Sequence, residues 1–578
     1  MLKPNLKEQV SLRSSGKTLM LFTLKYIAIA LLFINCKEMS KNEITKIPSS
    51  KESPFVWEGA NLYFLLTDRF NNGDPTNDIN FNRTKKTSKL RGFEGGDLKG
   101  IIQKIDDGYF ENLGINAIWF TPIVEQIHGI VDEGTGNTYG YHGYWAKDWT
   151  KLDPNFGTKK DLKELVDKAH QKGIRIVLDA VINHTGPTTE IDPVWPDNWV
   201  RTGPQCTYKD FETTAACTLV ENLPDIKTES DNNVELPEHL VQKWKEENRY
   251  DQEITELDTF FKRTGYPRAP RFYIIKWLTD YIEEFGIDGY RADTAKHIEE
   301  SVWTEFKNEC DYAFAEWKKL NPDKVLDDNN FFAFGEVYNY NISQAKAFDF
   351  GDKKVNYFDF GFDAMINFEF KSNALGGYED IFSRYSEILN GEIKGNTVVN
   401  YLTSHDDGSP FDKERTKSIE TANKLLLSPG ISQVYYGDES ARSLVIEGTA
   451  GDATLRSNMN WESIRTNKQT QSILTHWQTL GKFRRDHPAI GAGVHQMISN
   501  SPYVFSRVFK KNDYEDSVII GLDLPKGKKE IDVSSMFKDG EVLIDKYSNN
   551  EVEVRGGKVT LKTGFNFVLL ELRNDVLE

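Results

Sequence analysis

The stretch Phe272-Tyr-Ile-Ile-Lys-Trp-Leu-Thr-Asp-Tyr-Ile-Glu-Glu-Phe-Gly286-Ile-Asp-Gly-Tyr-Arg-Ala-Asp293 carries the signals of a helix and a strand in one run. Its apolar residues recur at helical spacing up to Phe285, and Gly286 marks the end of the helix. A short apolar run over residues 289–293 follows and ends on a carboxylate. A helix that leads directly into a buried strand is the repeating unit of a parallel sheet.

The same alternation runs through most of the chain. Further short apolar runs occupy residues 61–67, 115–121, 174–182, 331–337, 398–403 and 431–436, and helical spacing returns at Leu162, Leu165, Val166 and Ala169. Strands that read as continuous apolar runs are buried on both faces, which is typical of a parallel sheet covered by helices. About eight such units in roughly 430 residues favour an α/β fold of the (β/α)8 TIM-barrel type. The periodicity by itself leaves an open, doubly wound sheet as the alternative.

Two parts of the chain depart from this alternation. Residues 185–270 are polar, irregular and rich in proline, and they are too long for an ordinary loop, so we expect an inserted subdomain after the third strand. Beyond residue 488, short β-rich runs separated by Gly, Lys, Asn and Asp predict a C-terminal antiparallel β-sandwich over residues 489–578. The barrel itself is therefore expected over residues 54–488.

The composition restricts the partners of the chain. Its 578 residues include 71 Lys and Arg against 88 Asp and Glu, which gives a formal net charge of −17. This balance lacks the cationic surface that phosphate backbones need, so we expect no nucleic-acid partner. The 12 Trp, 24 Tyr and 35 Phe belong mostly to the core, but flat aromatic faces also stack on sugar rings.

The N-terminal residues resemble an export signal. Basic residues precede an apolar stretch whose uninterrupted part, residues 26–34, is too short to span a bilayer and suits a signal peptide over residues 1–35. Cys36 follows directly, as in a bacterial lipoprotein cleavage site, although Asn35 replaces the usual small residue. We therefore expect export to the cell envelope, a lipid anchor on Cys36 in place of a spanning helix, and a flexible tether over residues 36–53.

The expected export also bears on the oxidation state of the other cysteines. Cys206 and Cys217 would reach an oxidising compartment, so we expect a disulfide between them that closes a short loop in the insertion. Cys310 lies in a helical pattern and is expected to be a buried thiol. The four cysteines of the sequence show no Cys-x-x-Cys spacing of a metal site.

Polar side chains stand where four of the expected strands end. These segments are 179–184, 289–293, 334–337 and 403–406, and each carries a carboxylate. In a parallel barrel such ends meet at one mouth. Crowded carboxylates repel one another and lose solvation, so a chain keeps them mainly for function. Paired carboxylates suit cleavage of a glycosidic bond, in which one attacks the anomeric carbon and another protonates the leaving oxygen.

In order and spacing, these segments resemble the conserved regions of the α-amylase family of glycoside hydrolases (family 13). The matching residues are Asp179, Asn183 and His184 for the first region, Arg291, Asp293, Lys296 and His297 for the second, Glu336 for the third, and His405 and Asp406 for the fourth. Flanking stretches such as Tyr141-His-Gly-Tyr-Trp145 and Leu223-Pro-Asp225 agree as well. The similarity covers roughly residues 55–490, and the insertion falls where that family keeps its subdomain B.

The resemblance implies the roles of individual residues. Asp293 would be the nucleophile of a retaining reaction, Glu336 the general acid and base, and Asp406 the group that stabilises the transition state. Arg291 would keep the Asp293 carboxylate ionised. Substrate contacts are implied for Tyr144, His184, Lys296, His405, Asp452 and Arg456. Ser404 stands where the family commonly has Asn, which bears on the orientation of His405 but removes no catalytic carboxylate.

The same resemblance implies a cofactor and an activity. A Ca²⁺ ion is expected between barrel and insertion, held by Asn183, Asp225 and the backbone carbonyl of His297, because oxygen donors suit this cation. The implied activity is endo-hydrolysis of α-1,4 bonds, with α-glucans of the starch or maltodextrin type as partner. The alternatives are a pullulan- or cyclodextrin-degrading enzyme or a glucanotransferase, which share the three carboxylates. A non-catalytic glucan-binding protein is a further alternative, and such proteins typically lack at least one of them.

Overall fold

The computed structural model describes residues 53–132 and 134–573. The predicted signal peptide, Cys36 and nearly all of the predicted tether lie outside these ranges. Among the described residues, no helix combines the length and the apolar character that crossing a membrane requires.

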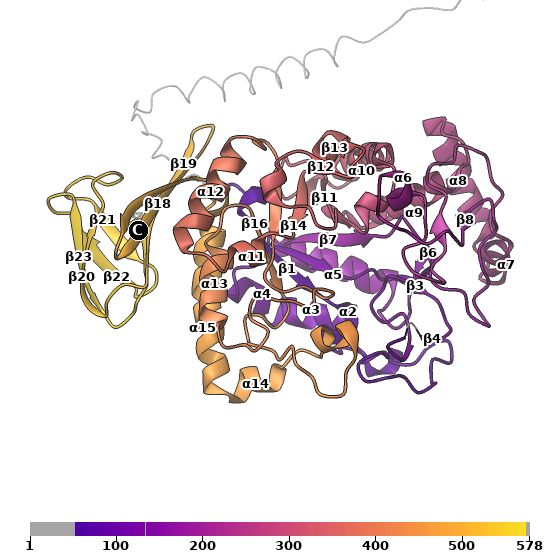
Figure 1. Cartoon of the computed structure of the whole chain (residues 1–578), viewed down its shortest axis with the longest axis horizontal. Helices are drawn as coiled ribbons and strands as arrows, with labels where there is room; N and C mark the ends of the chain where they lie inside the picture. The colour runs from indigo at the N-terminus through magenta and orange to yellow at the C-terminus, as the bar shows by residue number, and fades with distance from the viewer. Residues whose placement is uncertain (1–52, 133, 574–578) are drawn as a thin grey trace, which may run out of the picture. The chain divides into compact units, whose positions relative to one another are not determined.

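Eight parallel strands close into a barrel, which confirms the predicted (β/α)8 fold and excludes the open sheet. The barrel strands are β1 (Asn61–Leu65), β2 (Ala117–Phe120), β7 (Arg175–Ala180), β10 (Gly289–Ala292), β11 (Phe332–Gly335), β14 (Ala364–Asn367), β15 (Thr397–Asn400) and β16 (Ile431–Tyr435). Every residue of these strands is buried, which explains why they read as continuous apolar runs. Figure 1 shows them inside a layer of helices.

The longer helices cover the outside of the barrel. They are α3 (Leu98–Asp106), α5 (Lys159–Gln171), α9 (Pro270–Phe285), α10 (Glu300–Leu320), α12 (Tyr378–Asn390), α13 (Ser418–Leu426) and α15 (Lys468–Asp486). Helix α9 ends at Gly286, whose φ of 73° favours glycine and whose amide donates to the Ile282 carbonyl at 2.9 Å. A Cβ atom at Gly286 would lie 2.0 Å from the Trp317 ring, so no other residue fits this turn.

One barrel strand has no counterpart among the predicted ones. Strand β14 has only four residues, Ala364–Asn367, and lies in a run where phenylalanines and acidic residues alternate from Phe358 to Phe370. Neither a clear apolar block nor a turn signal marks its ends. Pairing with β11 and β15 on either side defines this strand, and that pairing is long-range.

The insertion lies between β7 and α9 and is more regular than predicted. It contains β8 (Val200–Arg201), α6 (Glu212–Ala215), β9 (Asp225–Ile226), α7 (Glu238–Glu246) and α8 (Tyr250–Thr264). Helices α7 and α8 bury Leu240, Trp244 and Leu257 in the main core. A smaller excursion after β2 contains β3 (Val124–Gln126), β4 (Val131–Asp132), β5 (Asn137–Thr138) and β6 (Ala146–Leu152).

Short elements complete the barrel region. They are the helices α2 (Thr67–Phe70), α4 (Tyr109–Asn112), α11 (Phe370–Asn373), α14 (Trp461–Thr466) and α16 (Ala489–Ala492), and the hairpin of β12 (Phe348–Asp349) and β13 (Lys354–Val355).

The C-terminal residues form antiparallel sheets around a core of their own, as predicted. Six strands pair in the order β17 (Val494–Asn500), β18 (Tyr503–Lys511), β19 (Tyr514–Leu522), β24 (Val568–Leu572), β21 (Val542–Asp545) and β22 (Asn550–Glu553), and β20 (Gly527–Asp532) pairs with β23 (Lys558–Thr563). These sheets contact the barrel helix α12, where the His495 amide donates a hydrogen bond to Ser386 Oγ at 2.9 Å.

Candidate active site

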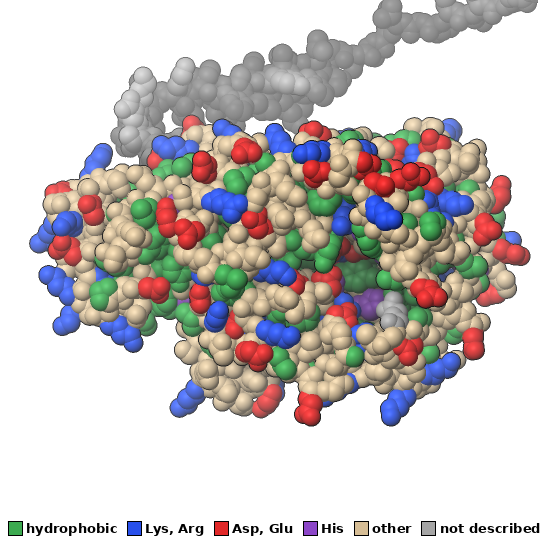
Figure 2. Space-filling view, in the orientation of Figure 1, with side chains coloured by type: hydrophobic (Ala, Val, Ile, Leu, Met, Phe, Trp, Pro, Cys, Tyr) green, Lys and Arg blue, Asp and Glu red, His purple; other side chains and the backbone are tan. Residues whose placement is uncertain are grey.

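The carboxyl ends of the barrel strands open into one cavity of about 380 Å³. Its lining includes eight of the residues singled out from the sequence, namely Tyr144, Asp293, His297, Glu336, His405, Asp406, Asp452 and Arg456. His184, Arg291 and Lys296 are buried beside or beneath them. Figure 2 shows a hollow on the face of the molecule with a histidine and hydrophobic side chains inside it.

Arg291 is the centre of the charge arrangement under this cavity. Strand pairing places it directly opposite Asp179 of β7, and its Nη1 lies 2.9 Å from Asp179 Oδ1. The same Nη1 lies 2.6 Å from Asp293 Oδ1, and Nη2 lies 2.8 Å from Glu336 Oε2. One buried guanidinium therefore holds three carboxylates from three adjacent strands.

Burial has a strong effect on the acid at the end of β11. Desolvation raises the pKa of Glu336 to about 8, because the neighbouring Asp293 and Asp406 charges add to it and outweigh the attraction of Arg291. The Thr294 amide donates to Glu336 Oε2 at 3.0 Å and orients the group. Glu336 is thus protonated at neutral pH and is able to donate a proton.

Asp406 has the opposite character. Its side chain is 45% exposed, and it lies 3.8 Å from His405 Nε2. Partial loss of solvation inside the cavity opposes ionisation of this carboxyl, but His405, Arg456 and Arg291 hold the pKa of Asp406 below its ordinary value. One carboxyl at the site is therefore kept neutral and another ionised, which is the division that acid and electrostatic roles need.

Asp179 supports the site from below. The indole Nε1 of Trp119 lies 3.2 Å from its Oδ2, and the Tyr144 hydroxyl donates to the same oxygen at 2.9 Å. Burial raises the pKa of Asp179 to about 7, against the attraction of Arg291. The hydroxyl bond fixes the Tyr144 ring, which stacks on His405 with centroids 5.4 Å apart.

The histidines of the site are buried and neutral. Burial lowers the pKa of His405 to about 4, and it also lowers the pKa of His184. His184 Nε2 lies 3.1 Å from the Tyr144 carbonyl oxygen. Neutral rings of this kind suit hydrogen bonds to uncharged hydroxyl groups.

Asp452 and Arg456 are more than an exposed ion pair. Arg456 Nη2 lies 2.5 Å from Asp452 Oδ2, and its Nε donates to the His405 carbonyl at 2.9 Å. Arg91 lies 2.8 Å from the other oxygen of Asp452. Arg91 was not predicted, and no sequence signal points to it, because 361 residues separate the two partners.

Other contributors were also missed from the sequence. His142, Thr294 and Tyr338 line the cavity, and Trp119 lies beneath it through its bond to Asp179. All four had a usable signal. His142 lies in the matching stretch 141–145, and Trp119 lies within the predicted strand 115–121. Thr294 and Tyr338 lie within two residues of a predicted catalytic carboxylate.

Two of the three predicted calcium residues, Asn183 and Asp225, lie together where barrel and insertion join. The Ile226 amide donates to the Asn183 carbonyl at 2.8 Å, and His184 and Asp225 form a bridge between their backbones. Neither carboxylate oxygen of the buried Asp225 accepts a hydrogen bond, and burial raises the pKa of Asp225 to about 9. A buried carboxylate of this kind favours a neighbouring cation. The Arg201 guanidinium already provides one, with its Nε 3.0 Å from Asp225 Oδ2.

The donor set for a metal is limited to oxygen. Within the described ranges, no group of three or more His, Cys, Asp or Glu is arranged to hold a metal ion. A cation at Asp225 would therefore depend on the Asn183 amide oxygen and on backbone carbonyls such as that of His297.

The cysteines of the insertion are joined. Cys206 and Cys217 form a disulfide, and the Thr214 carbonyl within the closed loop accepts a hydrogen bond from His297 Nδ1 at 2.9 Å. Cys310 is a buried free thiol on α10.

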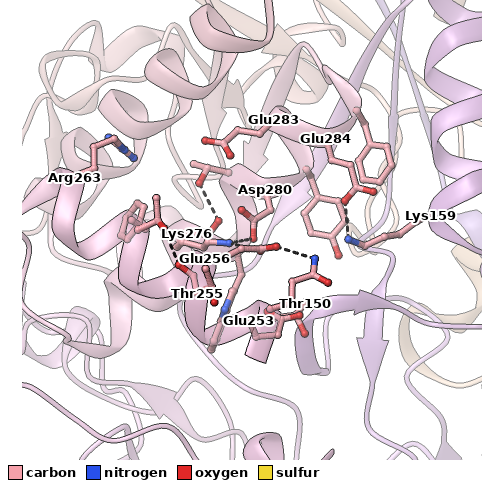
Figure 3. Close-up of a pocket in the computed structure, with 17 residues that line it drawn as sticks. Thr150, Lys159, Glu253, Thr255, Glu256, Arg263, Lys276, Asp280, Glu283 and Glu284 are labelled. Atoms are coloured by element: carbon pink, nitrogen blue, oxygen red, sulfur yellow. Dashed lines mark hydrogen bonds and ion pairs between the residues drawn. The ribbon is translucent and has the colours of Figure 1, made fainter. Parts of the chain in front are cut away.

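A somewhat larger cavity lies elsewhere, beside α8 and α9, with a volume of about 440 Å³ (Figure 3). Three of its acidic residues are already paired with lysines: Lys276 lies 2.6 Å from Asp280 and 3.0 Å from Glu256, and Lys159 lies 2.7 Å from Glu284. The cavity at the barrel mouth is therefore the better candidate for an active site.

Comparisons with known proteins show the family of the chain. Residues 64–486 match the family model described as alpha amylase, catalytic domain. The periplasmic alpha-amylase of Escherichia coli is 36% identical over 509 residues, which cover 78% of this chain and 70% of the relative. A cyclomaltodextrin glucanotransferase of Geobacillus stearothermophilus is 27% identical, over 78% of this chain and 58% of its own length. An Anoxybacillus alpha-amylase structure shares the fold, with a TM-score of 0.60 and 24% identity over 90% of this chain and all of that one.

Proposed function

The chain belongs to the α-amylase family of glycoside hydrolases, and from this premise we propose how it cleaves the α-1,4-glucosidic bonds of starch-type glucans. The observation that carries the proposal is the guanidinium of Arg291, which holds Asp293 and Glu336 together at one cavity. Two carboxylates on one cation lie close to each other, as the roughly 5 Å separation of a retaining pair requires.

In the first step Asp293 acts as nucleophile and Glu336 as acid. A carboxylate oxygen of Asp293 forms a bond to the anomeric carbon, while the bond from that carbon to the glycosidic oxygen breaks. Glu336 gives its proton to the departing oxygen, for which its raised pKa suits it. In the second step Glu336 removes a proton from water, the water oxygen attacks the same carbon, and Asp293 is released.

The remaining residues bind and orient the sugar. We assign stacking on the ring to Tyr144, hydrogen bonds to hydroxyl groups to His184 and His405, and stabilisation of the oxocarbenium-like transition state to the ionised Asp406. Asp452 and Arg456 would contact sugars beyond the cleaved unit on one side, and Lys296 on the other.

We also propose a calcium ion and an exported location. Asn183, Asp225 and the His297 carbonyl would hold Ca²⁺, which would brace barrel and insertion without entering the reaction. Export is supported by the apolar N-terminal run and by the periplasmic description of the Escherichia coli relative. Lipid attachment at Cys36 is the further step of this proposal, and it rests on the sequence around Cys36.

A glucanotransferase is the second candidate, because relatives of that description match the chain. It would use the same glycosyl-enzyme and pass the sugar to a glucan hydroxyl instead of water.

Product analysis separates these proposals. The purified chain would be incubated with amylose, pullulan and a cyclodextrin, and products would be identified by chromatography and proton NMR. We expect short maltooligosaccharides released from amylose with the α configuration. Cyclic or longer glucans would favour the transferase, β-configured products would refute the retaining mechanism, and unchanged substrates would refute the catalytic function.

A further inference from the structure

A cavity of about 320 Å³ lies at the end of the barrel opposite the mouth. Phe332 begins β11, Asp363 directly precedes β14, Thr397 begins β15, and all three line this cavity. Parallel strands share one direction, so these N-terminal ends lie on the face opposite the ends that carry the catalytic carboxylates. Four residues separate Phe332 from Glu336, a rise of about 13 Å along an extended strand. The cavity is therefore separate from the catalytic one.

Aromatic rings with a fixed orientation form one part of the lining. Trp57 lies in a short 3-10 helix before β1 and is half-buried. Its ring stacks on Phe332, with centroids 4.0 Å apart and 10° between the planes, and Phe55 meets it edge-on at 5.0 Å. Phe509 of β18 is also half-buried and lines the same cavity. Rings already held by other rings lose little freedom when a ligand binds, and their flat faces suit the apolar faces of sugar rings.

Polar groups form the rest of the lining. Thr397 is 3% exposed, and its Oγ1 has no hydrogen-bond partner among the described residues. Asp363 next to it is fixed, because its Oδ2 accepts from the Ala333 amide at 2.9 Å and its carbonyl accepts from the Thr397 amide at 3.0 Å. The amides of Asn330 and Asn396 add further donors and acceptors. A buried hydroxyl without a partner costs free energy, which a ligand rich in hydroxyl groups recovers.

The charges of the lining restrict the class of ligand. The carboxylates of Glu58 and Asp363 stand against the ammonium groups of Lys510 and Lys511, so the formal charges cancel. Lys510 in addition lies 3.0 Å from Glu515. A phosphate-bearing ligand needs an excess of positive charge, and a cation needs an excess of carboxylates. The balance favours an uncharged ligand with both hydroxyl groups and apolar faces, and the volume is within the usual range of ligand sites, roughly 300–1,000 Å³.

We propose that this cavity is a second binding site of the protein and that it takes a neutral sugar ring. Trp57 and Phe509 supply the apolar contacts, and Asp363, Thr397 and Asn396 bind the hydroxyl groups. The inference goes beyond the proposed function and does not depend on it. A glucan held at this face stays attached to the protein independently of the mouth.

The test follows single tryptophans by ¹⁹F NMR in the Asp293→Asn chain labelled with 5-fluorotryptophan, so that no substrate is consumed. The Trp57 resonance is identified by its loss in Trp57→Phe. The Trp145 resonance, which reports the catalytic cavity, is identified by its loss in Trp145→Phe. We expect maltoheptaose to shift both resonances, each with its own concentration dependence. Cellohexaose has β-linked glucose units, so the sugar that shifts Trp57 identifies the linkage that the site accepts.

Thr397→Val removes the hydroxyl and keeps the shape of the side chain. It should raise the Kd measured at Trp57 about threefold to tenfold, the range of one hydrogen bond, and leave the Trp145 titration unchanged. Thr421→Val is the matched control, at a buried threonine whose hydroxyl donates to the Lys417 carbonyl, and should change neither. A Trp57 resonance that responds to neither sugar, or whose Kd is the same in Thr397→Val, would overturn the proposal. A Trp145 resonance that ignores maltoheptaose would instead count against the proposed function.

Discussion

Replacement of Glu336 by glutamine should stabilise the protein increasingly as the pH rises. The folded-state pKa of Glu336, about 8, lies above its ordinary value of 4.5, so the folded state binds this proton more tightly than the unfolded state. The parent therefore loses stability between about pH 4.5 and pH 8. Glutamine does not titrate, so Glu336→Gln avoids this loss.

The size of this stability difference follows from the change in the pKa of Glu336. A rise from 4.5 to about 8 corresponds to at most about 5 kcal/mol, at roughly 1.36 kcal/mol per pH unit. The attraction of Arg291 is already part of this pKa, and rearrangement of the site around the ionised carboxylate reduces its cost, so we expect about 2–5 kcal/mol at pH 8. Over roughly 520 residues the unfolding entropy is about 1.1 kcal/mol/K, so the melting temperature should rise by about 2–4 °C.

Thermal unfolding followed by circular dichroism from pH 5 to pH 8.5 measures this difference. Glu190→Gln, at an exposed glutamate, is the matched control and should show a constant difference from the parent. Activity of Glu336→Gln should fall by about 10²–10⁴, so stability and function move in opposite directions. If the stability gap between Glu336→Gln and the parent stays flat or narrows with pH, Glu336 is not held protonated and its assignment as the acid is wrong.

Three further outcomes follow from the same site. Asp293→Asn should lower kcat on amylose by at least about a thousandfold with little change in melting temperature, measured by release of reducing ends; a mild loss would remove Asp293 from the nucleophile role. The value of kcat/KM should fall tenfold per pH unit above about pH 8, because Glu336 must be protonated to act. An alkaline fall that begins below pH 7 would contradict this. Chelator should lower the melting temperature and added Ca²⁺ restore it, whereas Asp225→Asn should respond to neither; a parent insensitive to chelator would refute the calcium site.

Much of the fold could be predicted from local patterns. The helical spacing that ends at Gly286 and the buried run after it are properties of neighbouring residues, and the structure has α9 and β10 there. Strand β14 could not be found in this way, because four residues carry too little periodicity and only its two partner strands define it.

The features of the candidate site also fall into those that local sequence predicts and those that depend on long-range contacts. Carboxylates at strand ends were visible because a parallel barrel brings all such ends to one mouth. The neutral state of Glu336 was not visible in local residue spacing, since it arises from burial and from charges on other strands. The pairing of Arg91 with Asp452 was equally hidden.

The sequence by itself therefore determined which chemical groups stand at the strand ends and which segments are helical. Those features depend on residues that are close to one another in the sequence. Only the tertiary structure decided that Arg291 holds three carboxylates and that Arg91 pairs with Asp452. The physical reason is that strand register and loop packing set the direction and burial of each side chain, and both are long-range.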